Sequence, residues 1–295
     1  MRIDAIIGYL ESLAHPSLQE HYDNAGLITG DPGWECTGMI CSLDATEEVV
    51  REAMFKGCNL IIAHHPIVFG GLKKFTGRNY VERTIILAIK NDIAIYSIHT
   101  NLDNVIGGVS GKMGELLGLK QVSILSPREQ TLKKLYTFAP LKDADSIRNA
   151  IFKTGAGEIG KYSECSFSTA GKGTFRPGEG TEPYVGREGE RHVEEEARVE
   201  VIFPAWLEKK VISALIGAHP YEEVAYDIVQ LANSHPGIGA GIIGELPEPV
   251  PEKEFLDRVR TVFGTGLIRH TPWLGRKLKR VAVCGGAGSF LISKA

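Results

Sequence analysis

The chain has 295 residues, enough for one large core or two domains. Hydrophobic residues make up 43% and charged residues 23%, as in an ordinary globular protein, and no apolar run approaches the roughly 20 residues that span a bilayer. A formal net charge of -3 gives no strong case for nucleic acid as a partner, and five scattered cysteines argue against a disulfide framework. We therefore expect a cytoplasmic protein, not bound to a membrane, with reduced thiols.

The first third of the chain is predicted to alternate strands and helices. Thr46 is the expected N-cap of the second helix, and Gly57 its C-terminal stop. The order βαβαβ predicts an α/β fold with a mainly parallel sheet, in which chemistry lies just past the carboxyl ends of strands. The predicted elements are a helix over 1–16, a strand over 37–44, a helix over 45–57, a strand over 58–66, a helix over 80–93 and a strand over 94–99.

The pattern changes near Pro127, where a βα-ββ-αβ order begins that is typical of a ferredoxin-like unit. We predict an inserted α+β domain over residues 130–235 and a core formed by residues 1–129 with 236–295. The predicted elements are a strand over 132–140, a helix over 143–157, two or three antiparallel strands within 164–204, a helix over 205–220 and a strand over 222–232, followed in the core by a helix over 250–264, a strand over 278–286 and the start of a helix over 287–295.

His64 and His65 stand at the end of a predicted strand, followed by a proline. Adjacent side chains on a strand point to opposite faces, so two adjacent histidines do not easily clasp one ion. At a strand end they can diverge toward two ions about 3.5–4 Å apart, the usual separation in two-metal sites. The plainer interpretation is one buried structural histidine and one surface histidine, and the His-His pair alone favours it.

Asp103 follows the end of the next predicted strand, within the segment SIHTNLDN. A carboxylate there could bridge two cations, and His99, four residues earlier, could support the site or shuttle a proton. The alternative is that Asp103 caps the glycine-containing turn that follows. Together, the histidine pair and Asp103 support a metal site more strongly than either does alone, because both fall on the same edge of one predicted sheet.

Other segments give weaker signals. Asp23 and Asn24 are better explained by a turn, although they could support a site indirectly. His219, Glu222 and Glu223 offer ligand-type atoms, but they fall in the predicted insert, and a packing or interface role is favoured. The glycines of GIGAGIIGEL form a GxGxxG pattern that fails as a dinucleotide-binding motif, since a proline-rich stretch follows instead of a helix.

Seven segments of the chain, in this order, resemble the sequence motifs of a known family: DNAGLITGDP, SLDAT, IIAHHPIVFGGLKK, SIHTNLDNVIGGVS, GTFRPGEGTEPYVG, HPYEEVAYDI and VAVCGGAGS. The chain resembles the dinuclear-metal proteins known as GTP cyclohydrolase 1 type 2 homologues, in their long form. The likeness covers essentially the whole chain.

The resemblance implies a two-lobed α/β metal-binding core interrupted by a PII/CutA-like insert, in a toroidal homohexamer. It implies two divalent metal ions per subunit, such as Zn, Fe or Mn, with His64, His65 and Asp103 among the ligands. The family also uses a His and a Glu four residues apart near its C-terminus. This chain has no counterpart after His270, so we expect the natural protein to continue beyond Ala295.

Two classes of function follow. The first is a metal-dependent hydrolase of a nucleotide-type substrate, for which the family name suggests opening of the GTP ring. The second is a non-enzymatic, metal-loaded oligomer that binds a small molecule or regulates a partner. Turnover that depends on the metal ligands would distinguish the first from the second. A third and plainer alternative is an α/β oligomer with buried histidines and no metal, which metal content would decide.

Overall fold

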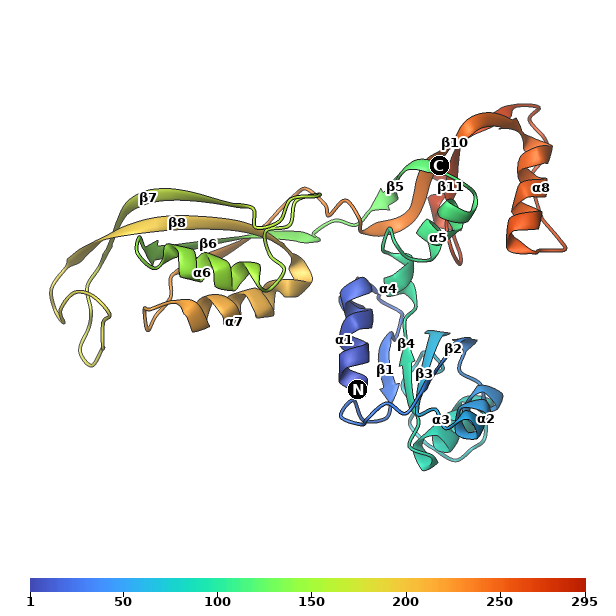
Figure 1. Ribbon diagram of the computed structural model, residues 1–295, viewed down its shortest axis with the longest axis horizontal. Coiled ribbons are helices and arrows are strands. Elements are labelled where there is room, and N and C mark those ends of the chain that lie inside the picture. Colours follow the sequence, from blue (N-terminus) through green and yellow to red (C-terminus); the bar gives the residue numbers. More distant parts are fainter. The chain divides into compact units, whose positions relative to one another are not determined.

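The computed structural model describes all residues, 1–295, and the chain divides into two compact units. One unit joins residues 1–127 to 236–295, and the other holds residues 128–235 (Figure 1). Each unit has its own buried apolar core. No helix is both long and apolar enough to cross a bilayer.

Three parallel strands form the centre of the first sheet. They are β2 (Met39–Asp44), β3 (Leu60–His65) and β4 (Ala94–Ser97), and the sheet order is β1-β4-β3-β2. The edge strand β1 (Gly26–Thr29) runs antiparallel to β4. The predicted, mainly parallel sheet is therefore confirmed, and β3 and β4 end at the same edge.

Two helices make the crossover connections that parallel strands require. In α2 (Glu47–Lys56), the Thr46 side chain accepts a hydrogen bond from the Val49 N–H, and Gly57 ends the helix in the left-handed conformation at φ 68°. The expected cap and stop are confirmed. Together with α3 (Tyr80–Lys90), α2 packs on the sheet through a buried cluster whose members are Ala45, Val50, Ala53, Ile61, Ala63, Ile85, Ala88, Ile93 and Ile95.

Two buried asparagines fix the segment that follows β4. This segment forms the single turn α4 (Thr100–Asp103). The Asn101 side-chain amide donates to the Ala14 carbonyl at 2.7 Å, and that of Asn104 donates to the Leu18 carbonyl at 2.9 Å. Both acceptors follow α1 (Ile3–Leu13), which lies beside the first sheet in Figure 1. The asparagines of SIHTNLDN thus hold α4 against the N-terminal segment.

The first unit contains a second, antiparallel sheet of three strands in the order β11-β10-β5. The glycine-rich stretch that could have been a nucleotide-binding loop belongs to its central strand, β10 (Gly239–Pro251), which confirms the rejection of that motif. The strands β5 (Lys120–Pro127) and β10 are not predicted by the sequence, and in β10 glycine and proline weaken the strand signal. The other elements are α5 (Val109–Leu116), α8 (Glu252–Phe263) and β11 (Lys277–Val283).

The helix expected to start over 287–295 is present as a 3-10 helix, Ser289–Lys294, and not as an α-helix. A segment this short gains too few α-helical hydrogen bonds to offset the cost of nucleation, and 3-10 turns are common in such short pieces.

The second unit is a four-stranded antiparallel sheet with two helices. Its strand order is β7-β8-β6-β9, and both helices lie on one side of the sheet in Figure 1. Leu135, Ala197 and Val199 point toward the helices and are buried with Ile147 and Leu215. The elements are β6 (Leu132–Pro140), α6 (Ala144–Phe152), β7 (Ser166–Phe175), β8 (His192–Pro204), α7 (Glu208–Ala218) and β9 (Tyr226–Gln230).

Candidate metal centre

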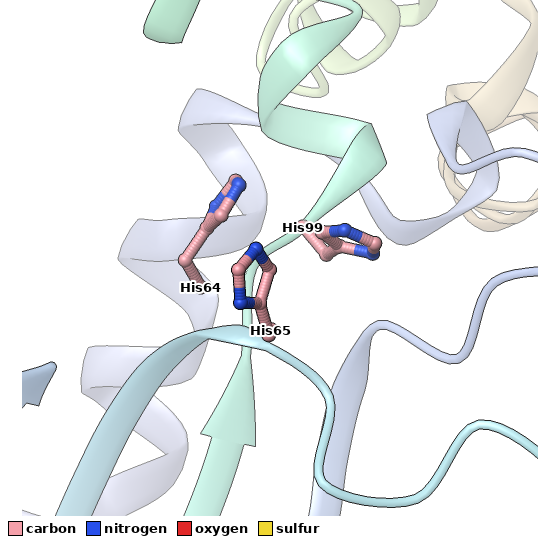
Figure 2. Close-up of side chains that lie close together, drawn as sticks. All are labelled: His64, His65 and His99. Carbon is pink, nitrogen blue, oxygen red and sulfur yellow. The ribbon is translucent and has the colours of Figure 1, made fainter. Parts of the chain in front are cut away.

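Three histidines meet at the carboxyl edge of the parallel sheet. His64 and His65 are the last two residues of β3, and His99 lies two residues beyond the end of β4. Figure 2 shows the three imidazole rings grouped together. Their ring centroids are 5.0 to 5.4 Å apart. Each ring offers a nitrogen, and these nitrogens all lie within 4.8 Å of one another. Such a group could hold a metal ion.

The rings of His64 and His65 are oriented by hydrogen bonds at Nδ1. The Nδ1–H of His64 donates to the Ile98 carbonyl at 2.9 Å, and Nδ1 of His65 lies 2.8 Å from Oδ1 of Asp44. This leaves Nε2 of each ring for another partner. Metal-binding histidines almost always use their second nitrogen in this way, which fixes both the tautomer and the direction of the ring.

His99 is held by a buried carboxylate. Its Nδ1 lies 2.8 Å from Oδ1 of Asp23, whose side chain is 0% exposed. The Thr100 N–H donates to Oδ2 of Asp23 at 3.0 Å, and the Thr100 hydroxyl donates to the same oxygen. Burial alone would raise the pKa of Asp23, but the hydrogen bonds from His99, Thr100 and the Asn24 N–H hold it below its usual value. Asp23 therefore remains an anion beside His99.

Asp103 lies at the end of α4, near the imidazoles but outside the group of three. Its Oδ1 is buried and has no hydrogen-bond partner. Burial raises the pKa of Asp103, while His64 and His99 act in the opposite direction. A buried carboxylate oxygen without a partner is costly, unless a cation is bound there.

The three candidates from the second unit lie outside the histidine group, and two of them make other contacts. Both ring nitrogens of buried His219 are occupied: Nε2–H donates to the Phe138 carbonyl at 2.9 Å, and Nδ1 accepts from the Tyr221 N–H at 3.1 Å. The Glu222 carboxylate accepts from the Glu182 N–H at 3.1 and 3.2 Å. Neither these residues nor Glu223 joins the histidine group.

Two carboxylates support the histidines in ways that the sequence motifs do not reveal. The sequence favours a turn over a supporting role for Asp23, and its motifs do not single out Asp44. The signal for Asp44 was its place at the end of β2, the strand that pairs with β3 so that Asp44 stands beside His65. The contact from Asp23 spans 76 residues, and no local pattern could reveal it.

The family model for Duf34/NIF3 (NGG1p interacting factor 3) matches residues 1–295. The chain belongs to the Duf34/NIF3 family. The family resemblance read from the sequence is thereby confirmed.

Curated members of this family are similar along almost the whole chain. A Halalkalibacterium halodurans protein is 39% identical over 285 residues, which cover 96% of this chain and 77% of the relative. A Bacillus subtilis protein is 38% identical over 291 residues, which cover 98% and 78%. Both are named GTP cyclohydrolase 1 type 2 homolog.

Two solved structures share the fold of this chain. A Bacillus cereus protein related to NIF3 is 40% identical, with a TM-score of 0.86 and coverage of 100% of this chain and 79% of that one. A Staphylococcus aureus protein is 27% identical, with a TM-score of 0.71 and coverage of 98% and 76%. The mixed α/β architecture is therefore that of the family.

Proposed function

We propose that this Duf34/NIF3 protein binds two divalent metal ions at the edge of the parallel sheet and hydrolyses a nucleotide-type substrate there. The observation that carries the proposal is the group of three imidazoles, in which each Nδ1 already has a partner and each Nε2 is left for a ligand. The names of the curated relatives support a cyclohydrolase-type reaction on GTP.

The donor set fits a metal. His64 and His65 supply imidazole nitrogens, and Asp103 supplies a carboxylate with a buried, unpartnered oxygen. Imidazole with carboxylate suits Zn, Fe or Mn. We propose these three residues as ligands. A second ion needs further donors.

His99 is proposed to move protons. Because Asp23 stays ionised, Nδ1 of His99 carries the proton of their hydrogen bond, and Nε2 of His99 is left to accept a proton. A bound metal pair would lower the pKa of a water molecule and stabilise negative charge on the substrate. His99 would take the proton from that water and return it to the leaving nitrogen or oxygen, while Asp23 holds the ring in place.

The experiment follows formate and phosphate release from GTP by the metal-loaded protein. We expect turnover that is abolished in His64→Ala together with metal binding. His99→Gln is expected to keep its metal and lose turnover by about 100-fold or more, the usual contribution of a general base. Loss of metal in His99→Gln would instead make His99 a ligand. No turnover across nucleotides at full metal loading would refute the hydrolase.

A second candidate function is a metal-loaded oligomer that binds a ligand or regulates a partner without catalysis. It is favoured by a pocket in the second unit, far from the histidines in sequence. In this account residues 130–235 are a ferredoxin-like, PII/CutA-like insert, and the chain assembles as a homohexamer. Nucleotide binding without turnover, together with a hexameric mass by light scattering, would support it. A monomeric mass would contradict the assembly.

A further inference from the structure

The second unit contains a cavity of about 670 Å³ that the proposed hydrolase chemistry does not use. Side chains alternate between the two faces of a strand. Ala197 and Val199 pack toward the helices, so Glu196 and Arg198 point to the opposite face of the sheet. Both line the cavity, together with Phe138. The cavity therefore lies over the face that no helix covers, beneath the segments that follow β7 and α7.

Glu196 is the unusual residue of this cavity. It is only 7% exposed, although its face of the sheet carries no helix. The Tyr221 hydroxyl donates to its Oε1 at 2.9 Å, and this is its one hydrogen bond. Glutamates are seldom buried unless a cation or several donors pair with them. A single neutral donor leaves Oε2 of Glu196 able to accept from a ligand.

Two glycines in the middle of β7 open the floor of the cavity. Gly171 and Gly173 both line it, and neither has the positive φ that would require glycine. A Cβ at Gly173 would collide with Oε2 of Glu196, so this glycine makes room for the carboxylate. A Cβ at Gly171 would meet nothing within 4 Å, which shows open space above the sheet. Glycine inside a strand often marks a place where a ligand approaches closely.

Aromatic rings form the walls. The ring centroid of Tyr221 lies 5.9 Å from that of Phe175 and 6.2 Å from that of Tyr184. The Lys142 ammonium already lies 4.6 Å from the centroid of the Tyr184 ring. Rings with a nearby carboxylate attract organic cations, because the face of a ring carries negative potential.

The basic residues of the cavity do not neutralise Glu196. The side chain of Arg198 is 48% exposed, lies 3.3 Å from the Glu200 carboxylate and stacks 4.5 Å from the Tyr136 ring centroid. Lys172 and Arg176 are exposed as well. The charge that is buried at this site is the negative one.

We propose that this cavity is a binding site for a small organic cation, a protonated amine with an aromatic or apolar body. The ammonium group donates to Oε2 of Glu196, and the body lies over Gly171 between Phe175 and Tyr221. The site is independent of the histidine group, and it would stand if the protein proved to have no hydrolase activity.

The test uses three probes of one shape and different charge on the full chain: 2-phenylethylamine, 2-phenylethanol and phenylacetate. Binding is measured by calorimetry and by saturation-transfer NMR. We expect the amine to bind at least about tenfold more tightly than the alcohol, since a charged hydrogen bond contributes on the order of 1.5 kcal/mol or more. Phenylacetate is expected not to bind. Equal or tighter binding of phenylacetate, or no binding of the amine, would overturn the proposal.

Variants locate the binding. Glu196→Gln removes the charge and is expected to abolish the preference for the amine. Glu195→Gln, on the opposite face of the same strand and exposed, is the matched control and should bind as the parent does. Gly171→Leu fills the open space without removing any group, so it tests the site even if Glu196→Gln fails to fold. Unchanged amine binding in Gly171→Leu would place the ligand elsewhere and refute the site.

Discussion

At the scale of single residues, hydrogen bonds at Nδ1 orient the three imidazole rings and leave the other nitrogen of each ring for a ligand or a proton. His64 is fixed by a backbone carbonyl, His65 by Asp44, and His99 by the buried Asp23. Each ring is thereby held in place, with one of its nitrogens within 4.8 Å of a nitrogen of the other two. The same residues without these partners could rotate freely, and the group would lose the arrangement that suits a metal.

The unpaired carboxylate of Asp103 gives a prediction at this scale. Burial raises the pKa of Asp103, so the folded state binds this proton more tightly than the unfolded chain does. The resulting contribution to the free energy of unfolding is fully present below the unfolded pKa and is lost as pH rises through the folded pKa. In Asp103→Asn the cost of ionisation disappears. We expect the metal-free variant to be more stable than the parent at neutral pH, by about 1 kcal/mol, and equal to it in acid.

Denaturant unfolding of both proteins without metal, over a range of pH, measures this difference. The same variant should bind less metal than the parent. Lower stability of metal-free Asp103→Asn at neutral pH would show that the Asp103 carboxylate has a stabilising partner in the metal-free protein, and would contradict this prediction.

At the scale of elements, the sequence predicted what is local and missed what is not. The cap at Thr46, the stop at Gly57 and the parallel βαβαβ order follow from neighbouring residues, and all are present. The edge on which the histidines meet follows from strand order alone. The strands β5 and β10 were missed, since their pairing joins segments more than 100 residues apart and β10 begins with glycines. The contact between Asp23 and His99 was hidden for the same reason.

The Glu82 side chain holds the segment that lies between the histidine pair and α3. From the first turn of α3 it accepts hydrogen bonds from the Thr76 N–H and hydroxyl at 2.8 and 2.9 Å and from the Arg78 N–H at 3.2 Å. The bonds from Thr76 lower the pKa of Glu82. Its stabilising contribution is therefore present above the unfolded pKa, about 4.3, and is lost as pH falls through the folded value.

We expect Glu82→Gln to lower the melting temperature at neutral pH, with the difference from the parent shrinking in acid. Thermal unfolding followed by circular dichroism at several pH values tests this. Glu52→Gln, which breaks an exposed pair with Lys56, is the control and should change little. A pH-independent difference for Glu82→Gln would show that its charge is not what matters.

At the scale of the whole molecule, the second unit begins and ends beside one strand pair. Pro127 at the end of β5 is paired with Gly239 at the start of β10, so the chain leaves and re-enters the first unit at neighbouring positions. Antiparallel strands can be joined by a short loop. The first unit thus has a closed connection available without residues 128–235.

Replacing residues 128–235 by a short glycine-containing linker should leave the first unit folded and able to bind metal. Circular dichroism and metal analysis of the shortened chain test this, and light scattering shows whether the oligomer survives. A shortened chain that folds but binds no metal would mean that the second unit contributes to the metal site, which the present account does not allow.

Elemental analysis of metal per chain tests for the metal site at the histidine group. The protein is purified without chelator or affinity tag. We predict about two divalent ions per chain, lost in His64→Ala and in Asp103→Ala and retained in the exposed control His270→Ala. No bound metal in the parent, or full metal content in the His64→Ala/His65→Ala double variant, would contradict it.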